Sequence, residues 1–163
     1  MFRRILVPID GSRTSNLGLA QAIEMAKDCD ATLCLLHVVD ELVVTQNLDG
    51  TTYVPASYVD GFMEALRQSG RKLLARAERK MERSGVRWQA VLVETLGHRV
   101  ADLIIEQARK WRADLIVIGT HGRRGLSRMV MGSDAESVVR AATVPVLLVR
   151  SRGEPRPKRR KRS

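Results

Sequence analysis

The sequence predicts an α/β protein with a three-layer, doubly wound, Rossmann-like fold, built from a five-stranded parallel sheet and four helices. Two observations lead to this prediction. Five short apolar runs alternate with four amphipathic stretches, in the order β-α-β-α-β-α-β-α-β. In most of these runs the apolar residues are consecutive rather than alternating. This pattern is typical of strands buried on both faces, as in a parallel sheet covered by helices.

The N-terminal third supplies the first two strands and the first helix. Residues 3–10, "RRILVPID", form an apolar run that ends at Pro8 and Asp10. Ser12 or Thr14 can cap the helix that follows, because their hydroxyls accept bonds from free backbone amides. The apolar face of that helix carries Leu19, Ala22, Ile23 and Ala26. Residues 31–40, "ATLCLLHVVD", predict a second buried strand.

The middle of the chain predicts a loop, a long helix and a strand. Residues 41–57 are a loop, because they contain an Asp-Gly pair, a proline and scattered polar residues. Residues 57–84 show helical periodicity, and Gly85 ends the helix. The apolar stripe of this helix comprises Phe62, Leu66, Leu73, Ala77 and Met81. Residues 86–94, "VRWQAVLVE", predict the third strand.

The C-terminal part supplies two helices and two strands. Residues 98–112 are a helix whose apolar stripe is Val100, Leu103, Ile104, Ala108 and Trp111. Residues 113–119, "ADLIVIG", are the fourth strand, and residues 144–150, "VPVLLVR", are the fifth. Between them, the last helix is marked by Met131, Ala135, Val138, Val139 and Ala142.

Length and charge indicate one domain, residues 1–150, followed by a basic tail, residues 151–163. The chain has 163 residues and a formal net charge of +10. The tail, "SRGEPRPKRRKRS", contributes seven Arg or Lys residues and one Glu, which leaves +4 for the domain. Because the tail has no apolar residue, we expect it to be disordered. No apolar run approaches the ~20 residues needed to cross a bilayer, and the N-terminus has no secretory signal, so we expect a cytoplasmic protein.

The two cysteines predict neither a disulfide nor a metal site. Cys29 and Cys34 fall at a helix end and in a strand, where buried thiols are common in a reducing compartment. None of the three histidines shows a zinc-type spacing with them.

Glycines gather after the fourth predicted strand, which is unusual because glycine costs conformational entropy on folding. Gly119 and Gly122 follow that strand, and Gly132-Ser133 opens the last helix. Glycine lets the backbone approach a ligand closely, and the free amides of a helix start suit an anion. His121, Arg123, Arg124 and Arg128 add positive charge nearby.

Asp10 follows the first predicted strand and is an acid that can accept bonds from ribose hydroxyls. Ligands of open α/β sheets bind beyond the carboxyl ends of the strands, where the winding reverses. If the first and fourth strands are neighbours, Asp10 and the glycines face one crevice. The spacing matches neither a Walker A loop nor the dinucleotide fingerprint Gly-x-Gly-x-x-Gly. On spacing alone, a nucleotide site and an ordinary glycine-containing turn both remain open.

The whole pattern resembles the ATP-binding branch of the universal stress protein family. Gly119-x2-Gly122-x9-Gly132-Ser133 matches G-x2-G-x9-G-[S/T]. The segments "ILVPIDGS", "LLHVVDE", "ADLIVIGTHGRRGL" and "VPVLLVR" are similar to that family in the same order, so that the resemblance covers about residues 2–150. The resemblance implies strand order 3-2-1-4-5, an adenine nucleotide-binding domain over residues 1–150 and ATP, ADP or AMP as ligand, with or without Mg²⁺.

The resemblance also assigns residues to parts of the nucleotide. Asp10 is expected to contact the ribose, and the backbone at Pro8, Ile9 and Val38 to line the adenine pocket. The phosphates are expected at Gly119, Gly122, Arg123, Gly132, Ser133 and the backbone amide of Asp134, and Ile118 and His121 belong to the same site. Family members commonly form homodimers through the last strand, here Pro145 to Val149. Such pairing would cover an apolar sheet edge.

The leading hypothesis is therefore a nucleotide-dependent stress-response regulator with at most slow ATP hydrolysis. Phosphoryl transfer needs metal-binding acids. Near the glycines the sequence offers only Asp134, with Asp40 and Glu41 after the second strand. Two alternatives remain. The first is that the tail contacts nucleic acid or an acidic partner, although it lacks aromatic residues that stack on bases. An adenylating or ATP-pyrophosphatase enzyme shares the architecture, but its signature loops are absent. We expect no membrane partner.

Overall fold

A computed structural model of the chain describes residues 1–40, 56–95, 97–122 and 131–151, and everything below refers to these residues. Five strands and four helices alternate along the chain, as predicted. They are β1 (Arg4–Pro8), α1 (Arg13–Cys29), β2 (Thr32–Asp40), α3 (Ala56–Glu82), β3 (Arg87–Thr95), α4 (Val100–Lys110), β4 (Leu115–Gly119), α5 (Ser133–Ala141) and β5 (Val146–Val149).

The strands form one parallel sheet in the order β3-β2-β1-β4-β5, which confirms the predicted fold and strand order. Ile5 of β1 pairs with Leu33 of β2 on one side and with Leu115 of β4 on the other. The chain winds outward from β1 to β2 and β3, and in the opposite direction through β4 and β5. The winding therefore reverses between β1 and β4.

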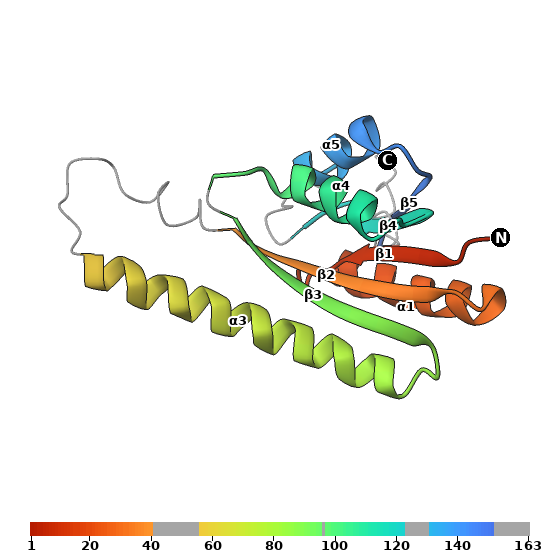
Figure 1. Cartoon of the computed structure of the whole chain (residues 1–163), viewed down its shortest axis with the longest axis horizontal. Coiled ribbons are helices and arrows are strands. Elements are labelled where there is room, and N and C mark those ends of the chain that lie inside the picture. The colour runs from red at the N-terminus through yellow and green to blue at the C-terminus, as the bar shows by residue number, and fades with distance from the viewer. Residues whose placement is uncertain (41–55, 96, 123–130, 152–163) are drawn as a thin grey trace, which may run out of the picture.

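Helices α1 and α3 cover one face of the sheet, and α4 and α5 cover the other (Figure 1). Successive residues of a strand point to opposite faces. In β1, Ile5 and Val7 pack beneath α1 and α3, whereas Leu6 packs beneath α4 and α5. Leu33 and Cys34 of β2 divide in the same way. Burial on both faces explains why the strands show as unbroken apolar runs in the sequence.

Helix α1 begins and ends at residues that stabilise a helix terminus. Ser12 is the N-cap, and its hydroxyl accepts a bond from the Ser15 amide at 3.2 Å. Asp30 ends the helix in the left-handed conformation, with φ of 52°. Of the two predicted caps, the structure therefore uses Ser12, and Thr14 is buried instead.

Two residues of the predicted apolar stripes are exposed. Phe62 of α3 is 41% exposed, and its neighbour Met63 is buried in its place. Val139 of α5 is 42% exposed, whereas its neighbour Val138 is fully buried. In both helices two apolar residues stand side by side, and 100° per residue lets only one of them face the sheet.

None of the helices in the described residues is both long and apolar enough to cross a bilayer. The predicted loop over residues 41–57 was too long at its end, because Ala56 and Ser57 begin α3, where alanine favours a helix. Its residues 41–55, and the predicted tail from residue 152 onward, lie outside the part of the chain that the structure describes.

Candidate functional site at the carboxyl ends of β1 and β4

Residues that follow β1 lie against residues that follow β4, because these two strands are neighbours at the centre of the sheet. This is the point where the winding reverses, and in open α/β sheets it is where ligands bind. The site is formed by Ile9 to Ser12, by Thr120 to Gly122 and by the start of α5.

A tight turn after β1 presents the Asp10 carboxylate. Ile9 still belongs to the sheet in its bonding, since its amide donates to the carbonyl of Leu36 at 2.8 Å. The Ser12 amide donates to Asp10 Oδ1 at 2.9 Å, which closes the turn through the side chain. Gly11 occupies the left-handed region with φ of 81°, where a side chain would be strained. These bonds hold the carboxylate beside the start of α1.

A buried histidine supports this turn from below. Nδ1 of His37, on β2, lies 2.7 Å from the carbonyl oxygen of Ile9, which can only accept. His37 therefore carries its proton on Nδ1 and donates this bond. The helix above it approaches closely at Gly70, where an added Cβ would lie 3.0 Å from the His37 ring. The turn after β1 thus rests on a side chain that is fixed by packing.

Gly119 ends β4 where α1 crosses it. A Cβ on Gly119 would lie 2.9 Å from backbone atoms of both Thr14 and Ser15. Real Cβ atoms do not approach backbone that closely, so this position requires glycine to let α1 pack onto β4. This packing role is distinct from the ligand contact that the sequence motif implies, and it accounts for the glycine by itself.

The backbone beyond β4 is held by hydroxyl groups at the start of α1. The carbonyl of His121 accepts bonds from the hydroxyls of Thr14 and, at 3.4 Å, Ser12. Thr120 donates its amide to Val149 of β5 at 2.9 Å. The Gly132 amide donates to the Thr120 carbonyl at 2.8 Å. The two ends of the segment from Thr120 to Gly132 therefore meet, and the first of them is bonded to β5 and to the start of α1.

Gly122 lies directly against Asp10. A Cβ placed on Gly122 would be 2.9 Å from Asp10 Oδ2. Gly122 itself is exposed and Asp10 is half-buried, so the two meet at the surface of the protein. Two segments more than 100 residues apart in the sequence therefore converge here, as predicted. A side chain at Gly122 would collide with the carboxylate, so glycine is what lets the two segments approach this closely.

Helix α5 begins beside the contact between Gly122 and Asp10. Its N-cap is Gly132, which supplies no side-chain cap, and the backbone of Gly132 lies next to that of Gly122. Ser133 and Asp134 are exposed at the first turn. Asp134 and Glu136 are both acidic and complement the positive end of the helix dipole. An anion at this helix start would therefore compete with two carboxylates.

The remaining predicted site residues lie at strand ends, on β2 or outside the described residues. Pro8 is half-buried at the end of β1, and Ile118 is buried at the end of β4. Val38, on β2, packs into the core beneath α4 and α5. Arg123, with Arg124 and Arg128, lies outside the described residues.

The His121 side chain carries an unusual atom. Its Nδ1 lies 3.0 Å from the Thr120 hydroxyl, while Nε2 is buried and has no hydrogen-bond partner among the described residues. Buried polar atoms without partners are rare and costly. The structure therefore places the ring of His121, which the sequence suggested as a source of positive charge, against Thr120.

Sequence reasoning missed the roles of Thr14 and His37. The sequence indicates Thr14 only as a candidate helix cap, and His37 only as one of three histidines without metal spacing. Ser12 and Thr14 stand two residues apart directly after a strand. This pattern could have indicated hydroxyls that bind a neighbouring loop. Nothing in the sequence pattern pointed to His37.

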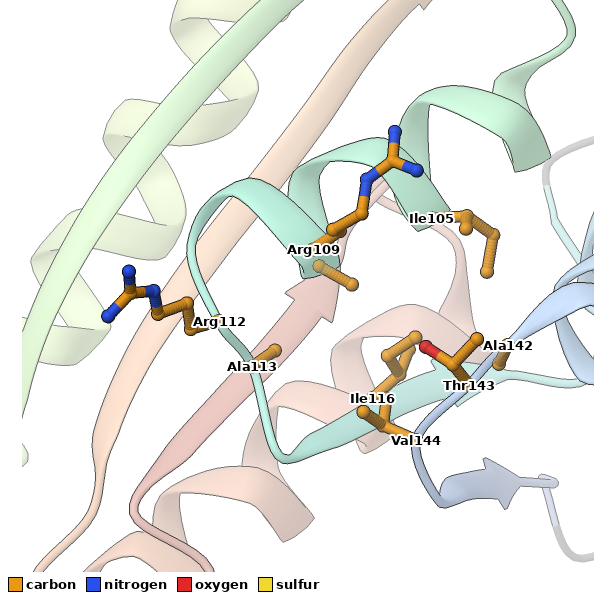
Figure 2. Close-up of a pocket in the computed structure, with 9 residues that line it drawn as sticks. Ile105, Arg109, Arg112, Ala113, Ile116, Ala142, Thr143 and Val144 are labelled. Atoms are coloured by element: carbon orange, nitrogen blue, oxygen red, sulfur yellow. The ribbon is translucent and has the colours of Figure 1, made fainter.

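Two hollows in the described surface lie away from this site. One, of about 70 Å³, lies between the end of α4 and the connection from α5 to β5, with Ile116 and Val144 at its apolar floor and Arg109 at its rim (Figure 2). Ligand pockets usually measure at least about 300 Å³, so this hollow is too small for a nucleotide. The other, of about 430 Å³, lies on α3 among four cationic side chains.

The described residues contain no group of three or more His, Cys, Asp or Glu side chains that could hold a metal ion. The described part of the site offers one carboxylate, backbone at glycines and a helix start.

Comparison with known proteins decides the family. The sequence profile of the universal stress protein family matches residues 1–150. The chain belongs to this family. The universal stress protein YxiE of Bacillus subtilis (strain 168) is 38% identical over 151 residues, which cover 92% of this chain and 100% of that protein. The fold also matches the structure of hypothetical protein MJ0577 with a TM-score of 0.80 at 22% identity, covering 94% of this chain and 99% of that one.

Two further universal stress protein structures are described with bound nucleotide. The family member from Arabidopsis thaliana, with AMP bound, matches with a TM-score of 0.66 at 18% identity, over 96% of this chain and 97% of that one. The protein from Archaeoglobus fulgidus, in complex with dAMP, matches with a TM-score of 0.61 at 23% identity, over 90% of this chain and 97% of that one.

Proposed function

We propose that the protein binds ATP in the crevice between the loops after β1 and β4, and that it acts as a nucleotide-dependent stress-response regulator. The observation that carries this proposal is the position of the Asp10 carboxylate against Gly122 at the reversal of the winding. The relatives with AMP and dAMP support an adenine nucleotide as the ligand class.

The geometry supports a division of roles. Asp10 accepts bonds from the ribose hydroxyls, because its turn holds the carboxylate at the crevice surface. The phosphates lie along the backbone at Gly122 and the start of α5, at Gly132 and Ser133, where the positive end of the helix dipole favours an anion. The backbone at Pro8, Ile9 and Val38 lines the base, with Ile118 in the same site. Gly119 contributes by letting α1 and β4 pack together beneath the site.

We infer that the site binds rather than turns over its ligand, with at most slow ATP hydrolysis. Catalysed phosphoryl transfer uses acids that hold Mg²⁺ between the phosphates and a group that positions the acceptor. The turn after β1 uses Asp10 in its own hydrogen bonds, and Asp134 caps the dipole of α5. Any Mg²⁺ then arrives with the nucleotide.

We also infer a homodimer that pairs the edge strands Pro145 to Val149 of two copies. β5 is the last strand of the sheet order and its four residues are only half-buried in the single chain. An apolar edge strand with unpaired backbone groups favours pairing with another strand.

The direct test is to denature the purified full-length protein and identify the released nucleotide by mass spectrometry. We expect an adenine nucleotide, and we expect ATP to bind the emptied protein in calorimetry. Asp10→Ala should reduce that binding at least about tenfold, because a charge-assisted hydrogen bond contributes roughly 1.5–3 kcal/mol.

A matched control is Asp60→Ala, which removes an exposed carboxylate from α3. This variant should bind ATP like the parent protein. If the emptied protein binds no adenine nucleotide, or if both variants lose affinity equally, the proposal is wrong.

A further inference from the structure

The outer edge of α3 carries a cluster of cations that the nucleotide site does not use. Arg76, Arg79, Lys80 and Arg83 line an open hollow of about 430 Å³. They are spaced three and four residues apart, so neighbouring members of the set lie side by side on the helix surface. None of the four makes an ion pair in the described part of the chain. We call these four residues the α3 cation cluster.

The acids of α3 lie on a different side of the helix. At about 100° per residue, the cluster and Lys72 fall within an arc of about 100°. Glu64, Glu78 and Glu82 fall outside that arc, on one side of it. Glu64 pairs with Arg71 on that other side, and Arg67 pairs with Glu94 of β3 at 2.9 Å. The helix therefore separates a charge-balanced edge next to β3 from an edge that carries only positive charge.

The cationic edge faces α1. Nζ of Lys80, a member of the cluster, donates a hydrogen bond to Asn16 Oδ1, on α1, at 3.4 Å. Cations near a helix C-terminus also stabilise the helix dipole, and this explains Arg79 and Lys80 in the last turn. The dipole effect falls off within one turn, so it does not explain Arg76 or Lys72. Mutual repulsion between unpaired cations costs free energy unless an anionic partner offsets it.

We propose that the α3 cation cluster binds the phosphate backbone of a nucleic-acid duplex. Arg76 to Arg83 span about 10 Å along the helix at 1.5 Å per residue. Phosphates of one strand follow each other every 3.4 Å along a duplex axis, so a rigid array of this length meets a run of them rather than a single anion. A stripe of Arg and Lys along one helix face is the electrostatic pattern of such binding.

The neighbouring side chains favour a duplex over a membrane surface. Helices that bind membranes place exposed aromatic or large apolar residues beside their cations. Among the described residues of α3, the exposed large apolar side chain is Phe62, and it lies almost three turns before Lys72. No aromatic side chain stands in the cluster to stack on an unpaired base, which points to contacts with the backbone of a duplex.

The test measures binding of a fluorescent DNA duplex of about 20 base pairs to the full-length protein between about 50 and about 200 mM salt. Arg79→Gln with Arg83→Gln should weaken binding about tenfold. The slope of log affinity against log salt should become shallower by about 1.8, because two phosphate contacts are lost. The control pair is Arg109→Gln with Lys110→Gln on α4, which removes the same charge from the opposite layer.

The control pair should leave duplex binding within about twofold of the parent protein. The basic tail is present in both pairs, so its contribution cancels in the comparison. ATP binding, measured in parallel, should stay unchanged in both pairs, which keeps this proposal separate from the nucleotide site. Equal losses in the two pairs would overturn the proposal, as would unchanged duplex binding. Loss of binding to phosphatidylglycerol vesicles without loss of duplex binding would also overturn it and assign the surface to a membrane.

Discussion

Asp10 and Gly122 touch across the centre of the sheet: Oδ2 of Asp10 lies 2.9 Å from where a Cβ of Gly122 would stand. A residue with any side chain at position 122 would therefore move the carboxylate or the backbone beyond β4. The two halves of the proposed nucleotide site are coupled by this contact, since neither can shift without the other.

The first prediction concerns this contact. Gly122→Ala should displace the Asp10 carboxylate and weaken ATP binding about 10- to 100-fold, because one charge-assisted hydrogen bond is misplaced. Stability should change little, since Gly122 is exposed. Calorimetry with ATP measures the effect. Gly61→Ala, in a part of α3 where an added Cβ meets nothing within 4 Å, is the control and should bind ATP normally.

The second prediction separates a packing glycine from a ligand glycine. Gly119→Ala should lower the free energy of unfolding by about 2–3 kcal/mol, because its Cβ would overlap backbone of α1. Gly18→Ala lies nearby but meets ordinary contacts at 3.9 Å, and in a helix it should raise stability by about 0.5–1 kcal/mol. Urea denaturation followed by circular dichroism measures both. Equal effects of the two substitutions would show that α1 and β4 are not as close as described.

How far the sequence predicts this molecule can be judged from those same glycines. The adjacency of β1 and β4, and hence the meeting of Asp10 with Gly122, could be predicted because right-handed crossovers and the family motif restrict the winding. The reason for Gly119 could not, because a sequence does not tell whether a glycine makes room for a ligand or for another helix.

The phase of a helix is also poorly specified by its sequence where apolar residues are adjacent. Phe62 and Met63 are adjacent in α3, and Met63 is buried because it lies on the same side of the helix as Leu74, Ala77 and Met81. The α3 cation cluster was missed for a related reason. Arginines and lysines are interspersed with glutamates along residues 71–83, and only the helical arrangement separates them onto different edges.

The third prediction concerns the acids at the start of α5. Asp134→Asn should increase ATP affinity about three- to tenfold, because it removes a negative charge beside the proposed phosphates. The gain should be smaller for AMP and should shrink as salt rises. It should also cost α5 about 0.3–1 kcal/mol of dipole stabilisation.

The control for this substitution is Asp102→Asn, which removes the acid from the first turn of α4. It should cost similar stability without changing ATP affinity. An unchanged affinity in Asp134→Asn would place the phosphates away from α5.

The fourth prediction concerns pH. Burial raises the pKa of the Cys34 thiol above its ordinary value of 9.0, although bonds from Gln89 and Gln107 partly oppose this. The unfolded thiol therefore ionises before the folded one. Its contribution to stability is fully present below pH 9.0 and is lost as the pH rises from there through the folded pKa. The free energy of unfolding should fall less steeply with alkaline pH in Cys34→Ala, although that variant starts lower because of its cavity.

Urea titrations at neutral and alkaline pH measure this difference. Iodoacetamide gives a second readout: at neutral pH Cys29, which is half-buried, should react before Cys34. Equal alkaline slopes in the two proteins would show that the Cys34 thiol is not desolvated.

The fifth prediction tests the proposed dimer through β5. The carbonyls of Pro145 and Val149 accept bonds from the amides of Ile116, in β4, and Thr120, directly after it, so the backbone groups of the odd-numbered residues of β5 face β4. The amides of Val146 and Leu148 therefore point to the open edge of the sheet.

Pairing with a second copy would bond these two amides, and water would bond them in a monomer. Hydrogen exchange should be slow at Val146 and Leu148 at high protein concentration, and it should quicken on dilution in step with the mass measured by light scattering. Fast exchange at both amides in a sample that light scattering shows to be dimeric would move the interface elsewhere on the molecule.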